Sequence, residues 1–531
     1  MPASASSAAR SPWSPLRIGL FRNLWIASVV ANTGTWMHDV GSGWLMTSLS
    51  PSPAMVALVS AAESVPIMLL ALPAGAIADI VDRRRLLLAV ETYAMVVTFV
   101  LAFLTWQDLT TAAILLWLTF AIGVGAALTT PAWPAIVPEL VPREELPSAI
   151  ALTSLAINAS RAIGPAIGGL LVASVGPWLV FALNGLSSIG ILVVLLCWRR
   201  RMKASALPAE RFTSAIRVGL RFVSHTRSLQ NVLVRGIAFF VFASATWSLF
   251  PLVVRRELGR GPETYGLLLT CIGLGAVGGA MLLPRVRERY SRGVQVAVAS
   301  LLYALAMLAL AYLHDVALLA GAMLATGVAW ITILSSLQIA AQLTLPEWVR
   351  ARGLAAFVVV FMGGMAIGSV LWGQVASWMG IPFALTAAAV GMAAAVALTR
   401  GLGLGEGHAR DFRPSMAWTP PVLVEPAQPD RSTMVTIEYR VQDDKRAEFV
   451  AAMREVREMR RRNGAYFWQL YHDAADPTRY LEVFMDESWT EHLRQHERAS
   501  NADREIQRRA KQYMVEGATT DPEHWLAEDE D

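Results

Sequence analysis

Three ionisable side chains stand inside long apolar runs of the sequence, where a charge is unfavourable unless it has a function or a partner. Asp39 follows His38 in the first run, Glu63 lies near the middle of the second, and Arg161 lies near the middle of the fifth. A charge at the centre of a bilayer costs about 3 kcal/mol or more, so it normally faces a cavity or an opposite charge. One interpretation is functional: a carboxylate carries a coupling proton, or Arg161 attracts an anionic substrate. The other is a structural ion pair, for which Glu63 matches the depth of Arg161 better than Asp39 does.

A second group of candidate residues closes the second apolar run, in the segment Gly-Ala-Ile-Ala-Asp-Ile-Val-Asp-Arg-Arg-Arg. It contains Gly75, Asp79, Asp82, Arg83 and Arg84. Gly75 and Asp79 are four residues apart and share one helix face, where the glycine lets another helix approach and the acid can face a helix N-terminus. The arginines can pair with that acid or with lipid phosphate. Ordinary positive charge on the cytoplasmic side accounts for the arginines, but not for Gly75 and Asp79.

A third group follows Arg161 in the fifth run and consists of Gly164, Pro165, Gly168 and Gly169. Small residues at this spacing leave a groove for a partner helix, and the proline frees a backbone carbonyl. Because glycine and proline are also common in ordinary membrane helices, a purely structural interpretation stays open.

Membrane helices must position these residues, because the composition excludes an ordinary soluble protein. Hydrophobic residues make up 55% and charged residues 16% of the 531 positions, whereas soluble domains carry roughly 25% charged residues. A hydrocarbon core about 30 Å thick needs about 20 apolar residues in a helix. Twelve such runs are predicted, at 22–46, 53–79, 86–106, 110–130, 148–173, 177–198, 229–254, 263–284, 294–313, 316–341, 353–377 and 381–399.

The distribution of Lys and Arg predicts the orientation of the chain. One alternate set of loops carries 21 basic residues and the other carries three, so both termini are predicted to be cytoplasmic. The placement of Lys and Arg in cytoplasmic loops also explains the positive net charge of the chain, so nucleic-acid binding is not needed to explain it. The predicted organisation is an N-terminal tail at 1–21, a six-helix bundle at 22–198, a central cytoplasmic loop at 199–228, a second six-helix bundle at 229–400, a Gly/Pro-rich linker at 401–431 and a cytoplasmic α+β domain at 432–531.

The last 100 residues differ from the rest in composition, with a net charge of −7. Alternating and amphipathic patterns predict a strand, a helix, two strands and two polar helices. His492 and His496 are four residues apart on one of these helices and could bind a metal, but no third ligand is evident, so no metal site is predicted. The two cysteines of the chain lie in apolar runs, which excludes a disulfide scaffold.

On these residues the chain resembles the major facilitator superfamily. The loop after the second run resembles a signature in which an acid and an arginine are believed to latch the two halves on the cytoplasmic side. Asp82 stands there at the usual second glycine, and Ile80 at a frequent arginine. The segment 161–169 resembles the antiporter motif of drug-exporting members, although Ser160 replaces one expected glycine.

The whole membrane body resembles one branch of that superfamily, the transmembrane secretion effectors, which include the bacterial enterobactin exporter. This resemblance rests on the proline-rich segment 131–142, on Asn158 and Arg161, and on the pattern around Trp36 and Asp39. It implies a permease of the bacterial inner membrane that exports siderophores or other small molecules by proton antiport. The proton gradient would be the driving force, with no cofactor.

The C-terminal domain, through the segment 488–498, is similar to domains appended to some secretion effectors. Its layout resembles the dimeric, ferredoxin-like α+β barrels of antibiotic-biosynthesis monooxygenases. The resemblance implies a docking or dimerisation module, with enzyme activity as the minority hypothesis.

The prediction is therefore an all-α polytopic membrane protein with twelve helices in a pseudo-symmetric six-plus-six arrangement, plus a small α+β domain. It is predicted to be a transporter and not an enzyme, with a small-molecule substrate, protons and lipid as partners. No Gly-rich phosphate loop is present, so ATP is not expected to power it. Two alternatives stay open, an importer of the same fold and a membrane-anchored enzyme or sensor that works through residues 432–531.

Overall fold

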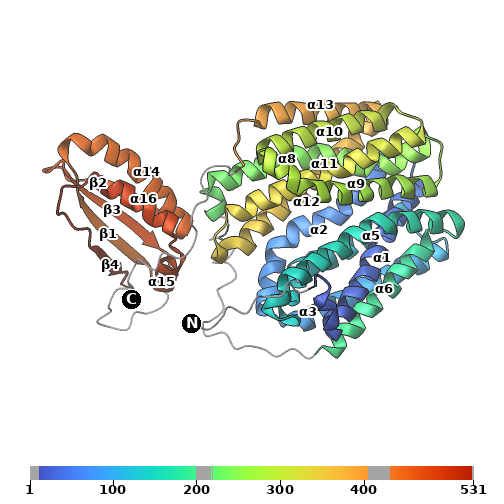
Figure 1. The fold of residues 1–531 in the computed structure, drawn as a ribbon, viewed down its shortest axis with the longest axis horizontal. Coiled ribbons are helices and arrows are strands. Elements are labelled where there is room, and N and C mark those ends of the chain that lie inside the picture. The colour runs from blue at the N-terminus through green and yellow to red at the C-terminus, as the bar shows by residue number, and fades with distance from the viewer. Residues whose placement is uncertain (1–10, 199–216, 218, 220, 405–430, 529–531) are drawn as a thin grey trace. The chain divides into compact units, whose positions relative to one another are not determined.

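The structure, a computed structural model, describes residues 11–198, 217, 219, 221–404 and 431–528. It divides into two compact units (Figure 1). The first unit comprises Met1–Ala209, Leu233–Gln338 and Phe357–Gly403, and the second comprises Glu210–Val232, Ile339–Ala356 and Leu404–Asp531. Residues 1–10, most of the predicted central loop and most of the Gly/Pro-rich linker lie outside the described residues, and so do the expectations for them.

Two sets of six long helices build the membrane part. The first set is α1 (Gly19–Leu49), α2 (Pro53–Ile80), α3 (Arg83–Trp106), α4 (Ala112–Leu140), α5 (Leu146–Ser174) and α6 (Pro177–Cys197). The second set is α8 (Arg227–Leu252), α9 (Pro262–Arg289), α10 (Arg292–Tyr312), α11 (Val316–Leu343), α12 (Arg350–Met379) and α13 (Ile381–Thr399). In the described residues, eleven of these helices are long and apolar enough to cross a membrane. The span expected at 22–46 stays a prediction, because α1 carries many polar side chains.

The joints between helices follow local backbone chemistry. Asp82 caps α3 by accepting a hydrogen bond from the Arg85 amide at 2.9 Å, which satisfies one of the free amides of the first helical turn. Gly176 and Gly380 precede α6 and α13 with φ angles of 118° and 90°, values that favour glycine because it has no Cβ. The same turn therefore stands before the last helix of each half, as expected for a repeated six-helix unit.

The prediction that the fourth apolar run ends at residue 130 is wrong. α4 continues through Pro131, Pro134 and Pro138 and ends at Leu140. Each proline removes one backbone hydrogen bond. Neighbouring helices and local adjustments make prolines tolerable in membrane helices, which is why the helix does not stop at the first of them.

The C-terminal domain has a four-stranded antiparallel sheet with α14 and α16 on one of its faces (Figure 1). The strand order is β2-β3-β1-β4, the ferredoxin-like arrangement that the sequence predicts. Its elements are β1 (Thr433–Arg440), α14 (Arg446–Asn463), β2 (Phe467–His472), β3 (Arg479–Asp486), α15 (Trp489–Arg498), α16 (Asn501–Lys511) and β4 (Pro522–Leu526). The sequence analysis missed β4, which is short and starts with a proline.

A buried polar network lies inside this domain. Glu482 has no exposed surface, and its carboxylate accepts hydrogen bonds from the Tyr439 hydroxyl at 2.8 Å, the Arg460 Nε at 3.0 Å and the Trp468 Nε1 at 2.9 Å. The Arg460 guanidinium also lies 4.2 Å from the centre of the Phe484 ring. A buried carboxylate is tolerated when several donors satisfy it, as they do here.

The second unit also contains contacts between this domain and segments that flank the membrane helices. Glu487 accepts hydrogen bonds from Arg217 at 3.0 Å and from Arg221 at 2.8 Å, both in the segment before α8. The Arg498 guanidinium of α15 lies 4.8 Å from the centre of the Trp348 ring, in the loop between α11 and α12. The domain is thus part of a unit that includes the ends of three membrane helices.

We predict that Glu482→Ala lowers the free energy of opening of the C-terminal sheet by about 3–5 kcal/mol, because three buried donors lose their acceptor. Amide hydrogen exchange of the β3 residues in the full-length protein measures it. The matched control is Glu438→Ala, which removes an exposed acid that pairs with Arg479 at 2.8 Å on the neighbouring strand and should change the value by about 1 kcal/mol or less. Equal effects of the two substitutions would contradict the prediction.

Candidate functional site

The two six-helix halves meet through the backbones of α5 and α9. A Cβ atom built on Gly266 of α9 would lie 2.9 Å from the Cα of Gly169, and one built on Gly273 would lie 2.6 Å from the carbonyl oxygen of Arg161. A Cβ on Gly169 would in turn lie 2.5 Å from the carbonyl oxygen of Pro262. No other residue fits at these positions without moving a helix, so glycines let the halves touch backbone to backbone.

The other face of α5 packs against α1 in the same way. A Cβ on Gly164 would lie 2.6 Å from the Cβ of Trp36, and one on Gly168 would lie 2.9 Å from the Cα of Met37. Pro165 places its carbonyl oxygen against Gly266. The four residues of the Gly-Pro segment therefore all lie in helix contacts, two toward α1 and two toward α9.

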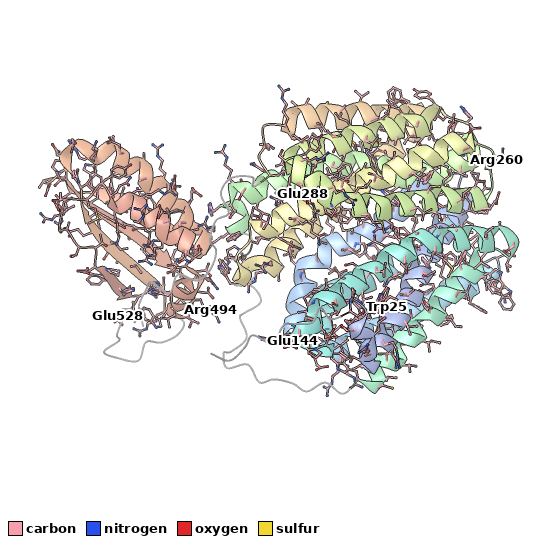
Figure 2. All side chains as sticks on the ribbon, viewed as in Figure 1. Trp25, Glu144, Arg260, Glu288, Arg494 and Glu528 are labelled. Atoms are coloured by element: carbon pink, nitrogen blue, oxygen red, sulfur yellow. The ribbon has the colours of Figure 1, made fainter. Side chains whose placement is uncertain are left out.

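Polar contacts join the halves at the end of the membrane unit where α9 begins. Arg255 donates to the Thr47 hydroxyl at 2.8 Å and to the Ser48 hydroxyl at 2.5 Å, and the Ala54 amide donates to the Ser377 hydroxyl at 3.0 Å. We call this end, made of residues 44–54, 251–266 and 373–377, the closed end. Figure 2 shows Arg260 near it, and Glu144 and Glu288 at the opposite end of the same helices.

At that opposite end two arginines of the charged segment 82–85 bind to helices of their own half. Arg83 pairs with Glu139 of α4 at 3.1 Å. Arg84 donates to the carbonyl oxygens of Leu195 and Leu196 at 2.7 and 2.8 Å, and so satisfies the last free carbonyls of α6. These two arginines thus hold α3 to its neighbours α4 and α6.

The close helix approach expected at Gly75 is absent in this state. No described atom outside its own helix lies within 4 Å of the position that a Cβ on Gly75 would take. The physical reason is that the halves touch at the closed end, and Gly75 lies at the other end of α2. The side chain of Asp79 is outside the described residues, and Asp82 serves as the cap of α3.

The carboxylates inside the membrane unit lie close to each other and to the second half. Asp39 and Glu63 interact electrostatically, and the Tyr265 hydroxyl of α9 interacts with both. Tyr265 is 6% exposed and stacks on Trp44 of α1 at a ring distance of 6.2 Å. The two acids of the first half are therefore next to an aromatic contact that links α1 to α9.

The ion pair expected between Arg161 and a carboxylate is not formed within 4.0 Å among the described residues. The Arg161 guanidinium instead lies 5.4 Å from the centre of the Trp36 ring. Its buried Nε has no hydrogen-bond partner in the described part of the chain. An aromatic face stabilises a cation by about 0.5–2 kcal/mol, less than a carboxylate would in a site without water, so Arg161 keeps the capacity to bind an anion.

A row of aromatic rings crosses from one half to the other and was not identified from the sequence. Trp36 of α1 lies 6.5 Å from Trp247 of α8, which lies 5.3 Å from Trp330 of α11, and Trp330 lies 6.1 Å from Phe361 of α12. The rings come from four long helices of the membrane part, and periodicity in the sequence does not show which face of each helix they share. With Arg161 at one end, the row offers stacking surfaces and one positive charge.

Comparisons with known proteins agree with this architecture. A family described as transmembrane secretion effector matches residues 10–530. The chain is 25% identical to a staphyloferrin A transporter of Staphylococcus aureus over 54% of this chain and 72% of that protein. It is 26% identical to the multidrug efflux pump Tap of Mycolicibacterium fortuitum over 69% and 90%, and 29% identical to the enterobactin exporter EntS of Salmonella typhimurium over 48% and 61%.

Solved transporters share the fold. The nucleoside transporter NupG aligns with a TM-score of 0.62 at 12% identity, covering 72% of this chain and 99% of that one. A bacterial homologue of the human lysosomal transporter Spinster, in an inward-facing and unoccupied conformation, aligns with a TM-score of 0.57 at 15% identity, covering 74% and 98%. At these identities the likeness establishes the six-plus-six fold and nothing finer.

We predict that Gly266→Val opens the closed end, because the new side chain would overlap the backbone of α5. The measurement is cross-linking of a Ser48→Cys, Arg255→Cys pair in membranes with a flexible bifunctional thiol reagent, because an arginine side chain spans more than a direct disulfide can. The yield should fall about fivefold or more, the fold-change that corresponds to about 1 kcal/mol. The matched control is Gly278→Val on the same helix, where no described atom lies within 4 Å of a Cβ. Unchanged cross-linking in Gly266→Val would show that the glycine contact does not hold this end.

Proposed function

Because the chain belongs to the transmembrane secretion effector family, we propose that it exports a small organic molecule by proton-driven alternating access. The observation that carries this proposal is the backbone contact of α5 and α9, which joins the halves at one end through glycines and leaves the end at Gly75 without such a contact. Two rigid halves that are joined by a backbone contact without interlocking side chains can rotate relative to each other about that contact.

In this proposal the arginine-rich end of the membrane unit faces the cytoplasm of a bacterial cell, and both termini lie there as well. The closed end then faces outward, so the structure corresponds to a state that is open to the cytoplasm. Asp79 and Arg83 would stabilise the opposite state, when the halves approach at Gly75. In the present state Arg83 pairs with Glu139.

The proposed solute site combines Arg161 with the aromatic row of Trp36, Trp247, Trp330 and Phe361. Aromatic faces suit a planar or apolar solute, and the guanidinium suits an anionic group on it. The named relatives export siderophores and drugs, and we propose the same range for this chain, namely a siderophore, drug or secondary metabolite.

Asp39 and Glu63 are the proposed proton carriers. Both are carboxylates within membrane helices, and an ionisable group at that depth is typical of a proton pathway. Their proton would leave or arrive as the contact of Trp44 and Tyr265 opens, because Tyr265 lies in the second half and interacts with both acids. In this proposal, opening of the closed end is therefore coupled to proton exchange at Asp39 and Glu63.

The test is transport by everted membrane vesicles with a proton gradient, using a panel of siderophores and drugs. An exporter accumulates its substrate in everted vesicles and not in right-side-out ones, and protease should reach the C-terminal domain only in the everted ones.

Asp39→Asn and Glu63→Gln should each reduce gradient-driven accumulation at least tenfold. The control Asp315→Asn removes a carboxylate before α11 but keeps the oxygen that accepts from the Leu318 amide at 2.9 Å. Full activity in both test variants would contradict the proton-carrier role, and accumulation only in right-side-out vesicles would contradict export.

Dimerisation through the C-terminal domain is a further part of the proposal. The sheet face opposite α14 and α16 presents large side chains, with Tyr471 50%, Leu481 39% and Trp525 53% exposed. A second copy of the sheet would bury this face.

We predict that Leu481→Glu converts a dimer into a monomer in detergent, as measured by light scattering with size-exclusion chromatography. The control is Tyr290→Glu, which introduces an acid at an exposed position of the α9–α10 joint. If the unmodified protein is a monomer in detergent, the proposed dimerisation is contradicted.

A further inference from the structure

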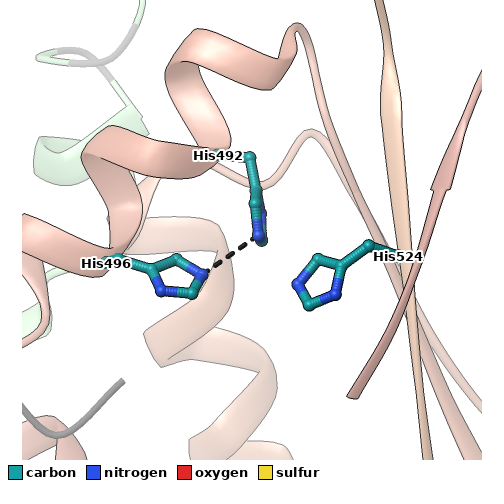
Figure 3. A group of neighbouring side chains, drawn as sticks. All are labelled: His492, His496 and His524. Atoms are coloured by element: carbon teal, nitrogen blue, oxygen red, sulfur yellow. Dashed lines mark hydrogen bonds between the residues drawn. The ribbon is translucent and has the colours of Figure 1, made fainter. Parts of the chain in front are cut away.

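Three histidines come together in the C-terminal domain, although one of them lies far from the others in the sequence. His492 and His496 lie one turn apart on α15, and His524 lies on β4 (Figure 3). One ring nitrogen from each lies within 4.8 Å of the other two. His492 is 1% exposed, and His496 and His524 are half-buried, so the cluster extends from the interior of the domain toward its surface.

The spacing of the nitrogens is close to that of a tetrahedral metal site. The Nε2 atoms of His492 and His496 are 3.0 Å apart. Two imidazole nitrogens that bind one tetrahedral ion at about 2.05 Å lie about 3.3 Å apart. The His524 ring centre lies 4.9 Å from that of His492 and 6.4 Å from that of His496. Small side-chain rotations of His524 and His496 therefore suffice to place three nitrogens around one ion.

A carboxylate orients the buried member of the cluster. Asp486, 1% exposed, accepts a hydrogen bond from His492 Nδ1 at 2.9 Å, and Gln495 Nε2 donates to the same carboxylate at 3.4 Å. With the proton on Nδ1, the Nε2 lone pair of His492 points into the space shared with His496 and His524. This carboxylate–histidine arrangement is the usual support of a metal-binding imidazole, because it sets the tautomer and raises the basicity of the ligand.

Imidazole binds a metal ion in its neutral form. Trp489 packs on His492 at a ring distance of 5.4 Å, which limits the access of water from that side. Three neutral imidazoles form a ligand set that suits Zn²⁺ and related transition metals, and does not suit Mg²⁺ or Ca²⁺.

We propose that His492, His496 and His524 bind one divalent transition-metal ion of the zinc type, with the fourth coordination position open to water. The ion would join α15 to β4, the short edge strand that pairs with β1 from Thr433 to Ile437. Its effect would be to hold the C-terminal strand in the sheet. This site is independent of the transport function proposed above, so failure of one leaves the other intact.

The test uses the full-length protein in detergent, purified without a polyhistidine tag and treated with a chelator. Titration with Co²⁺ should give the visible absorption of tetrahedral cobalt at one ion per chain, and Zn²⁺ should abolish it. Zn²⁺ should also slow amide exchange of residues 522–526. Absence of one-to-one binding, or binding without an effect on these amides, would overturn the proposal.

Variants separate this site from incidental binding. His524→Gln should weaken Co²⁺ binding about 100-fold or more, and Asp486→Asn about 10–100-fold, as for other outer ligands of metal-bound histidines. His496→Gln, at a half-buried position, provides a second ligand variant if His524→Gln alters the fold. The control is His472→Gln, an exposed histidine on β2, which should bind as the unmodified protein does. Unchanged affinity in both ligand variants would assign the bound ion to other residues and overturn the proposal.

Discussion

The contact of α5 with α9 is the constraint on which the rest of the membrane unit depends. Gly169, Gly266 and Gly273 bring the two backbones together, and no side chain interlocks the two helices at these points. Such a contact is held by dispersion and by the polar links at the closed end, and it loses little when the helices tilt against each other. A bundle that must stay assembled and still move needs this kind of joint.

Charges are placed around that joint in a consistent way. Arg83 pairs with Glu139 of α4, and Arg84 donates to a carbonyl oxygen of α6, so both arginines bind to neighbouring helices of the first half. At the other end the links between halves are hydrogen bonds of Arg255 to hydroxyl groups, which water can replace at little free-energy cost. The carboxylates of the interior, Asp39 and Glu63, interact electrostatically with Tyr265 of the second half.

The sequence predicted the features that short-range patterns encode. Apolar runs located the helices, and the spacing of Gly164 and Gly168 identified a helix-packing surface before its partner was known. The partner glycines on α9 look like any other glycines in a membrane helix, so only the structure identifies them. The missing counter-ion of Arg161 is a matter of helix rotation, which an apolar run does not specify.

The C-terminal domain shows the same limit. Its alternating strands and amphipathic helices predicted the fold, and the spacing of His492 and His496 marked one helix face. The sequence did not predict that His524 joins His492 and His496, because β4 has five residues, begins with Pro522 and shows no clear alternation. A ligand that depends on the register of a short edge strand can be found only when that strand has been placed beside β1.

The polarity of α1 bears on how the chain is assembled in the membrane. Its buried His38 lies against Phe181 of α6 at a ring distance of 4.8 Å, and Met37 lies against Gly168 of α5. These partners are synthesised more than a hundred residues later. A helix with so many polar groups gains little from lipid alone, so biogenesis must keep α1 beside the insertion machinery until α5 and α6 emerge. The packing of α1 is then completed only when α6 has been synthesised.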